Sequence, residues 1–176
     1  YDSQGRYDEA EALYRRALEV REKELGPDDL QVATSLNNLA ALFANRDEPA
    51  KAEPFYRRAL AIREKALGPS HADVSQSLNN VAMSLWQQGR SDEAEPLYRR
   101  AIEVGEKALG PDHPDLAVWL NNLGVLLWEG GRLAEAEPLY RRSLAIKEKA
   151  LGPDHPDVAT ALANLAVLHA VAGRRA

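Results

Sequence analysis

The sequence repeats itself with a fixed period, and this repetition restricts the fold more than any other feature. Leu-Gly-Pro stands at residues 25–27 and returns three times, at steps of 42 residues. Tyr-Arg-Arg, which begins at Tyr14, returns at the same steps. No insertion or deletion interrupts them, so four periods account for 168 of the 176 residues. Such a period is typical of solenoids, in which each unit packs only against its neighbours.

Each period contains two helical patterns separated by a tight turn. In the third period, apolar residues follow a helical spacing over 116–127, and a second such pattern covers 136–146. We call the first helix of a unit helix A and the second helix B. The final Gly-Pro of each period predicts the end of helix B. The turn between the helices carries Gly5, Asp47, Gly89, Gly131 or Gly173, residue types that suit left-handed backbone geometry.

This phase divides the chain into a single array with five segments. Their bounds are 1–27, 28–68, 70–110, 112–152 and 154–176. The first segment holds a helix B and the last holds only a helix A, so we expect about eight helices. Both terminal helices would expose a face that a neighbouring helix normally covers, which allows head-to-tail self-association. The first residue is not methionine, so we expect the chain to be a piece of a longer protein.

The two helices of a unit differ in charge. The A-helix segments 32–45, 74–88 and 116–128 contain no Asp, Glu, Lys or Arg, whereas the B helices carry many of them. A helix without a charged face is normally covered on most sides. We therefore expect helix B to form the outer, solvated layer and helix A to line the concave side of a superhelix.

Composition excludes several classes of function. The chain has no cysteine, which excludes disulfides and thiolate sites, and its net charge of -5 argues against a nucleic-acid partner. It shows no signal peptide and no membrane-spanning run, so we expect no membrane partner and a cytoplasmic location. His71, His113 and His155 recur one unit apart, too far to share a metal ion. We expect them in loops between units, and we expect no enzyme and no cofactor.

The unit resembles a tetratricopeptide repeat. Residues 120–146, LNNLGVLLWEGGRLAEAEPLYRRSLAI, carry that family's spacing of large and small residues. The family's usual unit has 34 residues, and the eight additional residues here, together with "LNNLA" and "ALGPDHP", resemble the kinesin light chain type, which is also widespread in bacteria. The resemblance implies an all-α, right-handed solenoid of stacked antiparallel hairpins. It also implies binding of a protein or peptide without catalysis.

Paired asparagines interrupt the apolar stripe of helix A. On a helical wheel, the second asparagine of each pair falls opposite the core, on the predicted groove side. An amide side chain can bond both the C=O and the N–H of an extended peptide. We therefore predict a peptide-binding groove that contains Asn38, Asn80, Met83, Trp86, Gln87, Asn122, Val125, Trp128, Glu129 and Asn164.

A structural role for the same side chains stays open. Buried amides between stacked helices can simply bond one another, and we expect this for Asn37, Asn79 and Asn121. Trp86 and Trp128 can equally pack against neighbouring helices, and we expect Trp119 to do so. At the level of the molecule, two alternatives to a peptide-binding scaffold remain: a sensor or regulatory region of a larger signalling or defence protein, and an architectural, self-assembling spacer.

Overall fold

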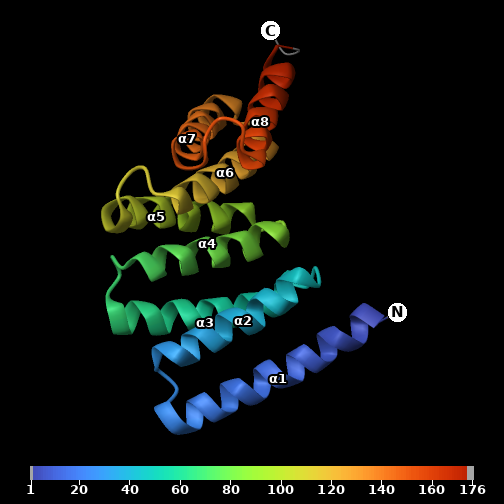
Figure 1. Ribbon diagram of the computed structural model, residues 1–176, viewed down its shortest axis with the longest axis vertical. Coiled ribbons are helices and arrows are strands. Elements are labelled where there is room, and N and C mark those ends of the chain that lie inside the picture. The colour runs from blue at the N-terminus through green and yellow to red at the C-terminus, as the bar shows by residue number, and fades with distance from the viewer. Residues whose placement is uncertain (1, 174–176) are drawn as a thin grey trace.

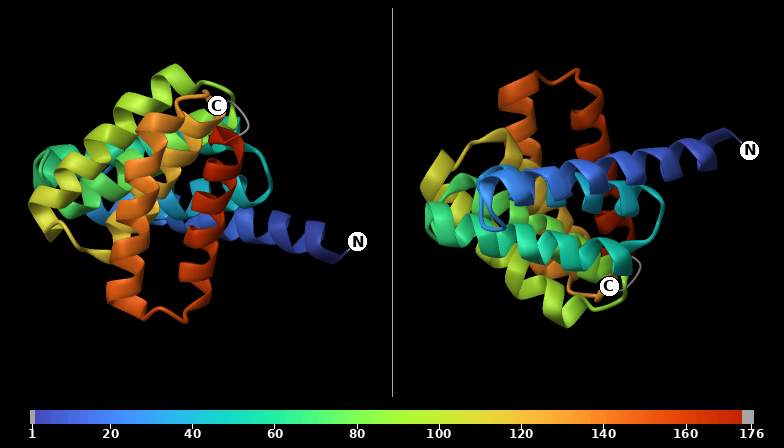
Figure 2. Two further views of the ribbon diagram at one scale, coloured as in Figure 1. Left: turned by 90° about the horizontal axis from the view of Figure 1, so that it is seen from above. Right: turned by 90° about the horizontal axis from the view of Figure 1, so that it is seen from below.

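The computed structural model describes residues 2–173, and within them the chain forms eight α-helices stacked into an elongated array (Figure 1). Along the chain they are α1 (Asp2–Leu25), α2 (Leu30–Asn45), α3 (Pro49–Leu67), α4 (Ala72–Gln87), α5 (Ser91–Leu109), α6 (Pro114–Glu129), α7 (Leu133–Leu151) and α8 (Pro156–Ala172). The even-numbered helices are the A helices and the odd-numbered ones are the B helices. Figure 2 shows that successive hairpins are rotated, so that α7 and α8 cross the direction of the first helices.

The helix boundaries follow from local chemistry. Each complete B helix ends at a glycine with positive φ, for example Gly68 at 85°. The A helices begin with a side-chain cap: Asp29 accepts the amide of Gln31, and the Nδ1 atom of His113 accepts the amide of Asp115. His71 and His155 do the same for their helices. The three histidines, expected only as loop residues, are therefore N-caps that satisfy otherwise unpaired backbone amides.

The turns inside the hairpins differ in part from expectation. Asp47, Gly89 and Gly131 adopt positive φ of 58°, 76° and 75°, as the turn requires. Gly5, in contrast, lies within α1 and forms no turn. In the other hairpins a preceding A helix folds back against the B helix, and no such helix precedes α1 within residues 2–173. Gly173 closes α8 with φ of -65° and does not adopt left-handed geometry.

The core runs through the array between the two layers. The small residues Ala40, Ala82 and Gly124 on the A helices are buried, as are their B-helix counterparts Ala52, Ala94 and Ala136. A Cβ atom placed on Gly124 would lie 2.7 Å from Cε1 of Tyr140, so this position has no room for a side chain. Small residues thus set the close approach of the helices within each hairpin.

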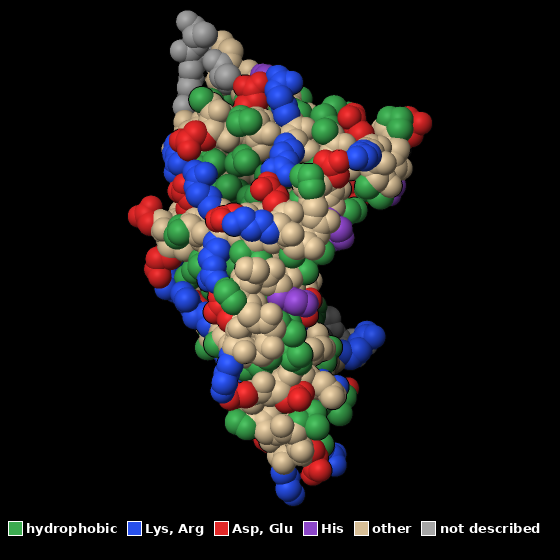
Figure 3. Space-filling model, turned by 90° about the vertical axis from the view of Figure 1, so that its left-hand side faces the viewer, with side chains coloured by type: hydrophobic (Ala, Val, Ile, Leu, Met, Phe, Trp, Pro, Cys, Tyr) green, Lys and Arg blue, Asp and Glu red, His purple; other side chains and the backbone are tan. Residues whose placement is uncertain are grey.

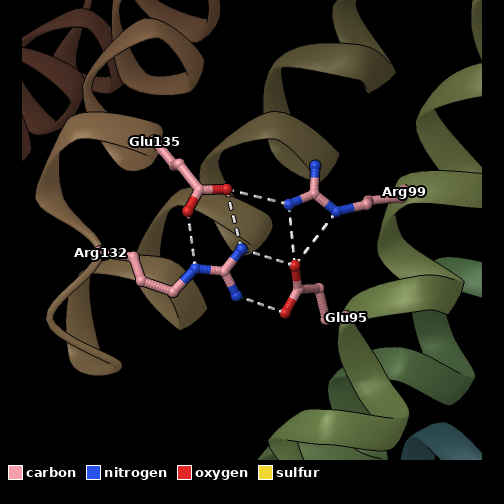
Figure 4. A network of polar contacts seen from close by, with 4 residues as sticks. All are labelled: Glu95, Arg99, Arg132 and Glu135. Atoms are coloured by element: carbon pink, nitrogen blue, oxygen red, sulfur yellow. Dashed lines mark hydrogen bonds and ion pairs between the residues drawn. The ribbon is translucent and has the colours of Figure 1, made fainter.

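Long charged side chains connect the B helices of adjacent units. Arg132 donates to Glu95 of the preceding unit and to Glu135 of its own, and Arg99 joins the same cluster (Figure 4). Arg90 with Glu53 and Arg46 with Glu11 repeat the connection in earlier units. Figure 3 shows basic and acidic side chains interleaved along one side of the molecule. The B helices therefore form a solvated layer.

Candidate functional site

The A helices are bonded to one another by their asparagines. Nδ2 of Asn80 donates to Oδ1 of Asn37 in the preceding unit at 2.9 Å. The same bond joins Asn122 to Asn79 at 3.1 Å and Asn164 to Asn121 at 2.8 Å. We call this series the asparagine ladder. Two short side chains span the gap between A helices, whereas longer Arg–Glu pairs connect the B helices, which agrees with the expectation that the A helices line the concave side.

The ladder leaves hydrogen-bonding capacity on the second asparagine of each pair. Asn80, Asn122 and Asn164 are half-buried, and Asn38 is exposed. In the described chain, the Oδ1 atoms of Asn80, Asn122 and Asn164 accept no hydrogen bond, and one N–H of each amide is unused. Asn79, in contrast, is only 6% exposed. The first asparagines thus orient the amides of the second ones, in agreement with the structural role expected of them.

The tryptophans of the A helices have three different environments. Trp119 is buried, as expected for a packing residue, and its ring occupies the space that a side chain at Gly105 would fill. Trp86 is half-buried, and its Nε1 donates to Oε2 of Glu129 at 2.7 Å. Trp128 is also half-buried, but the position one unit beyond Glu129 is Val171, which offers no side-chain acceptor.

Two hollows open between neighbouring A helices. The α6–α8 hollow, of about 190 Å³, is lined by Val125, Trp128, Tyr140, Asn164 and Val167. The α4–α6 hollow, of about 220 Å³, is more polar and is lined by Gln76, Asn79, Asn80, Asp115, Val118 and Trp119. Two of the predicted ladder asparagines, Asn80 and Asn164, therefore border open space and are not sealed between helices.

The surface of the A helices opposite the core has an unusual charge balance. On the helical wheel it comprises sixteen positions, four per helix at the spacing i, i+4, i+7 and i+11, which begin at Thr34, Gln76, Val118 and Thr160. Glu129 is the only charged residue among these sixteen groove positions. Burial, together with the Glu129 carboxylate, raises the pKa of Tyr140 to about 12. Arg57, Arg99 and Arg141 pair with glutamates one turn earlier on the B helices.

The structure brings some of the predicted residues together, leaves others outside the hollows, and adds residues that were not predicted. Val125, Trp128 and Asn164 share one hollow, and Asn80 borders the other. Met83 is half-buried against the core, and Gln87 is exposed. The lining residues Gln76, Val118 and Val167 hold groove positions on the helical wheel, so the periodicity signalled them. Tyr140 lies in the apolar pattern over 136–146, and this B-helix spacing does not reveal that its ring reaches a hollow.

Two further properties concern residues 2–173. No group of three or more His, Asp or Glu side chains there is arranged to hold a metal ion. None of the helices combines the length and the apolar character that a membrane crossing needs.

Comparisons with known proteins agree with this architecture. The sequence profile of the tetratricopeptide repeat matches residues 1–65, 32–107, 73–149 and 126–176, which together cover the chain. The crystal structure of BtubC (BKLC) from P. vanneervenii is similar over 98% of this chain and 68% of that one, with 30% identity and a TM-score of 0.86. No curated protein matches the sequence.

Two structures of nearly identical TPR-like repeats from Podosopora anserina, of kinesin light chain type, share the fold. Each is 23% identical to this chain and covers 99% of it; the TM-scores are 0.82 and 0.80, over 82% and 83% of those chains. Arrays of such repeats are typically scaffolds for protein–protein interaction. The all-α array of eight helices, the 42-residue units and the profile matches together show that the chain belongs to the tetratricopeptide repeat family, with units like those of kinesin light chains.

Proposed function

We propose that this chain is a non-catalytic, cytoplasmic scaffold that binds an extended peptide segment along the inner surface of its A helices. The observation that carries the proposal is the asparagine ladder. Its donor asparagines are half-buried, and two of them, Asn80 and Asn164, border the two hollows. Neighbouring A helices lie about 10 Å apart, and three extended residues span about the same length. One asparagine per unit can therefore bind the backbone of every third residue of an extended peptide.

The ladder also supports the proposal energetically. An exposed asparagine side chain loses rotamer freedom when it binds a ligand, which weakens affinity. Here Asn80, Asn122 and Asn164 are already oriented by their bonds to the preceding unit. Because this cost is met on folding, the amides are pre-organised for a peptide backbone.

The test separates binding from stability by mutating each side of one ladder bond. A peptide-array screen with the labelled chain supplies a binding sequence, whose affinity is then measured by fluorescence anisotropy. We expect Asn80→Ala together with Asn122→Ala to weaken binding about tenfold or more while circular dichroism stays helical. Asn79→Ala removes the acceptor of Asn122 but no groove amide, and it is expected to lower the melting temperature more than the affinity. Equal losses of stability and unchanged affinity in all variants would show that the ladder is structural only.

The terminal helices support a second candidate function, head-to-tail self-assembly. On α1, Leu13, Tyr14 and Val20 are 68%, 37% and 54% exposed, whereas the tyrosines equivalent to Tyr14 are buried in the other B helices. On α8, Leu162 is 49% exposed, although its counterpart Leu120 is buried. An α8 helix that packs on α1 of a second copy would reproduce the A–B interface inside each hairpin.

Sedimentation velocity over a range of concentrations tests this assembly. We expect the average mass of the 176-residue chain to rise with concentration, and we expect Leu162→Glu to abolish the rise. Val167→Glu is the matched control, because Val167 is equally exposed at 50% but lies on the groove side of α8. A constant monomer mass would contradict self-assembly and would leave the groove proposal untouched.

A further inference from the structure

The α6–α8 hollow differs from the corresponding place one unit earlier. There, the Trp86 ring is held by its hydrogen bond to Glu129. At α6 and α8, Val171 replaces that acceptor, and the indole N–H of Trp128 has no partner within residues 2–173. Val125 and Val167 complete the wall, and Val167 is 50% exposed. A water-accessible hollow with these walls suits an aliphatic side chain, and the free indole N–H suits a peptide carbonyl.

A third hollow lies where the start of α5 meets the end of α6. This α5–α6 hollow, of about 340 Å³, is lined by Ser91, Asp92, Glu95, Leu126, Glu129, Gly130 and Arg132. One unit earlier, the same space contains Gln88, whose Nε2 donates to Glu53 and to the carbonyl of Ser84. Gly130 replaces Gln88 and leaves the space open. Arg132 donates to Glu95 and Glu135 (Figure 4), and within residues 2–173 it forms no hydrogen bond or ion pair with Glu129.

Glu129 lines the α5–α6 hollow and directly follows Trp128, which lines the α6–α8 hollow. Its Oε2 atom accepts the Trp86 indole, and the side chain is otherwise exposed at the edge of the groove. The bond to Trp86 places the Glu129 carboxylate on the α4 side of α6, whereas the α6–α8 hollow lies on its α8 side. A peptide that crosses the A helices places residues of one face about 6.8 Å apart, less than the spacing of about 10 Å between neighbouring A helices. A long basic side chain two residues from the aliphatic anchor therefore lies over α6, within reach of Glu129.

From these contacts we infer that the groove selects an extended segment in which an aliphatic residue, anchored in the α6–α8 hollow, stands two residues from a lysine or arginine that pairs with Glu129. The inference rests on the proposed function and names the chemistry of its ligand. Charge complementarity supports a basic ligand and disfavours an acidic one, because the sixteen groove positions contain one carboxylate and no Lys or Arg. An acidic side chain of a peptide next to Glu129 would find no Lys or Arg among the groove positions to compensate its charge.

Designed peptide pools provide the probe. Fluorescein-labelled nine-residue pools carry Leu or Ser at position 5 and Lys or Glu at positions 3 and 7, with mixed Gly, Ser, Ala and Thr elsewhere. Lysine on both sides of the anchor covers both chain directions. In anisotropy titrations with the full chain, we expect the Leu/Lys pool to bind about tenfold more tightly than the Ser/Lys pool and about fivefold more tightly than the Leu/Glu pool.

Variants assign each preference to its hollow. Val167→Phe, which fills the α6–α8 hollow, is expected to abolish the preference for leucine; Leu151→Phe, at a similarly exposed residue at the end of α7, is the control. Glu129→Gln and Gly130→Gln are expected to remove the preference for lysine and to preserve that for leucine. The second variant installs the residue that fills the equivalent space one unit earlier, and Gly130 has room for a Cβ atom. Glu103→Gln, on an exposed Lys107 pair, is the charge control.

The outcomes separate the two proposals. If no pool binds and the array screen also yields no peptide, the groove itself does not bind peptides and the proposed function is wrong. If peptides bind with no preference for leucine over serine or for lysine over glutamate, the groove proposal survives and the ligand chemistry inferred here is wrong. The same holds if both preferences persist in Val167→Phe and Gly130→Gln.

Discussion

At the scale of single residues, one pair of positions shows how neighbouring units are matched. Between α3 and α4, Arg63 is buried and its Nη1 donates to Oγ of Ser77 at 2.7 Å. Between α5 and α6, the equivalent positions are Gly105 and Trp119, and a Cβ atom on Gly105 would lie 2.2 Å from the Trp119 ring. A large side chain thus comes from helix B at one junction and from helix A at the next. Arg63 of a B helix and Trp119 of an A helix therefore fill equivalent spaces at successive junctions.

This reciprocity predicts strong coupling between the two positions. Gly105→Ala should destabilise the chain by about 1–3 kcal/mol through overpacking, Gly105→Arg by at least as much, and Trp119→Ser by about 3–5 kcal/mol through a cavity. The double variant Gly105→Arg with Trp119→Ser recreates the Arg63–Ser77 pair and should cost much less than the sum of its two single variants. Urea unfolding of the parent, Gly105→Arg, Trp119→Ser and the double variant measures the coupling. Gly130→Ala is the control with open space, and simple additivity would contradict the matching of the pair.

At the scale of helices, the outer layer depends on the ionisation of its glutamates. The hydrogen bond from Arg132, followed by that from Arg99, lowers the pKa of Glu95 below its usual 4.5 despite opposing desolvation. At Glu53 desolvation is the largest influence and opposes ionisation, but Arg57, Gln88 and Arg90 together outweigh it, so its pKa is also lowered. A carboxylate with a lowered folded-state pKa stabilises the fold above its unfolded pKa, and this contribution disappears as the pH falls through the folded value.

The resulting prediction concerns stability in acid. We expect the urea midpoint of the chain to fall as the pH drops below about 4.5, the ordinary value for glutamate. Glu95→Gln should be less stable than the parent at pH 7 and should lose less stability between pH 5 and pH 3. Glu103→Gln, which removes an exposed pair with Lys107, should behave almost like the parent. Parallel pH profiles for the parent and Glu95→Gln would contradict this role of the outer cluster.

At the scale of the whole molecule, the repeat predicts the number of helices, their order and their two layers. Period, stop signals and charge contrast all act locally, so they are readable in one sequence. The features that the sequence did not predict depend on contacts between units. The asparagine ladder joins residues 43 apart, the role of His113 as a cap depends on the direction of Nδ1, and Tyr140 reaches a hollow that two other helices complete. Gly5 was predicted to form a turn from its register alone, but that turn needs a helix to fold against.

Two deletions of one period test the modular array. Removal of 63–104 and removal of 70–111 each take out 42 residues, and the two products differ only in retaining Gly105 or Arg63. In both products Asn122 takes the place of Asn80, so we expect a new asparagine bond from Asn122 to Asn37 across the junction. The first product retains Gly105 opposite Trp119 and should fold with a reduced melting temperature. The second places Arg63 against Trp119 and should be clearly less stable in thermal unfolding followed by circular dichroism. Equal stability of the two products would contradict this account of the junction.

The contrast between short amide bonds inside and long ion pairs outside has a mechanical consequence. Added salt screens the exposed Arg–Glu pairs but barely affects the half-buried amides. The asparagine ladder then holds the A helices at a constant spacing, while the distance between neighbouring B helices is free to increase. Small-angle X-ray scattering should record a more tightly coiled and more compact particle at high ionic strength. The solenoid would in this way behave as a spring whose curvature, and with it the width of the trough offered to a ligand, is set by the surrounding electrolyte.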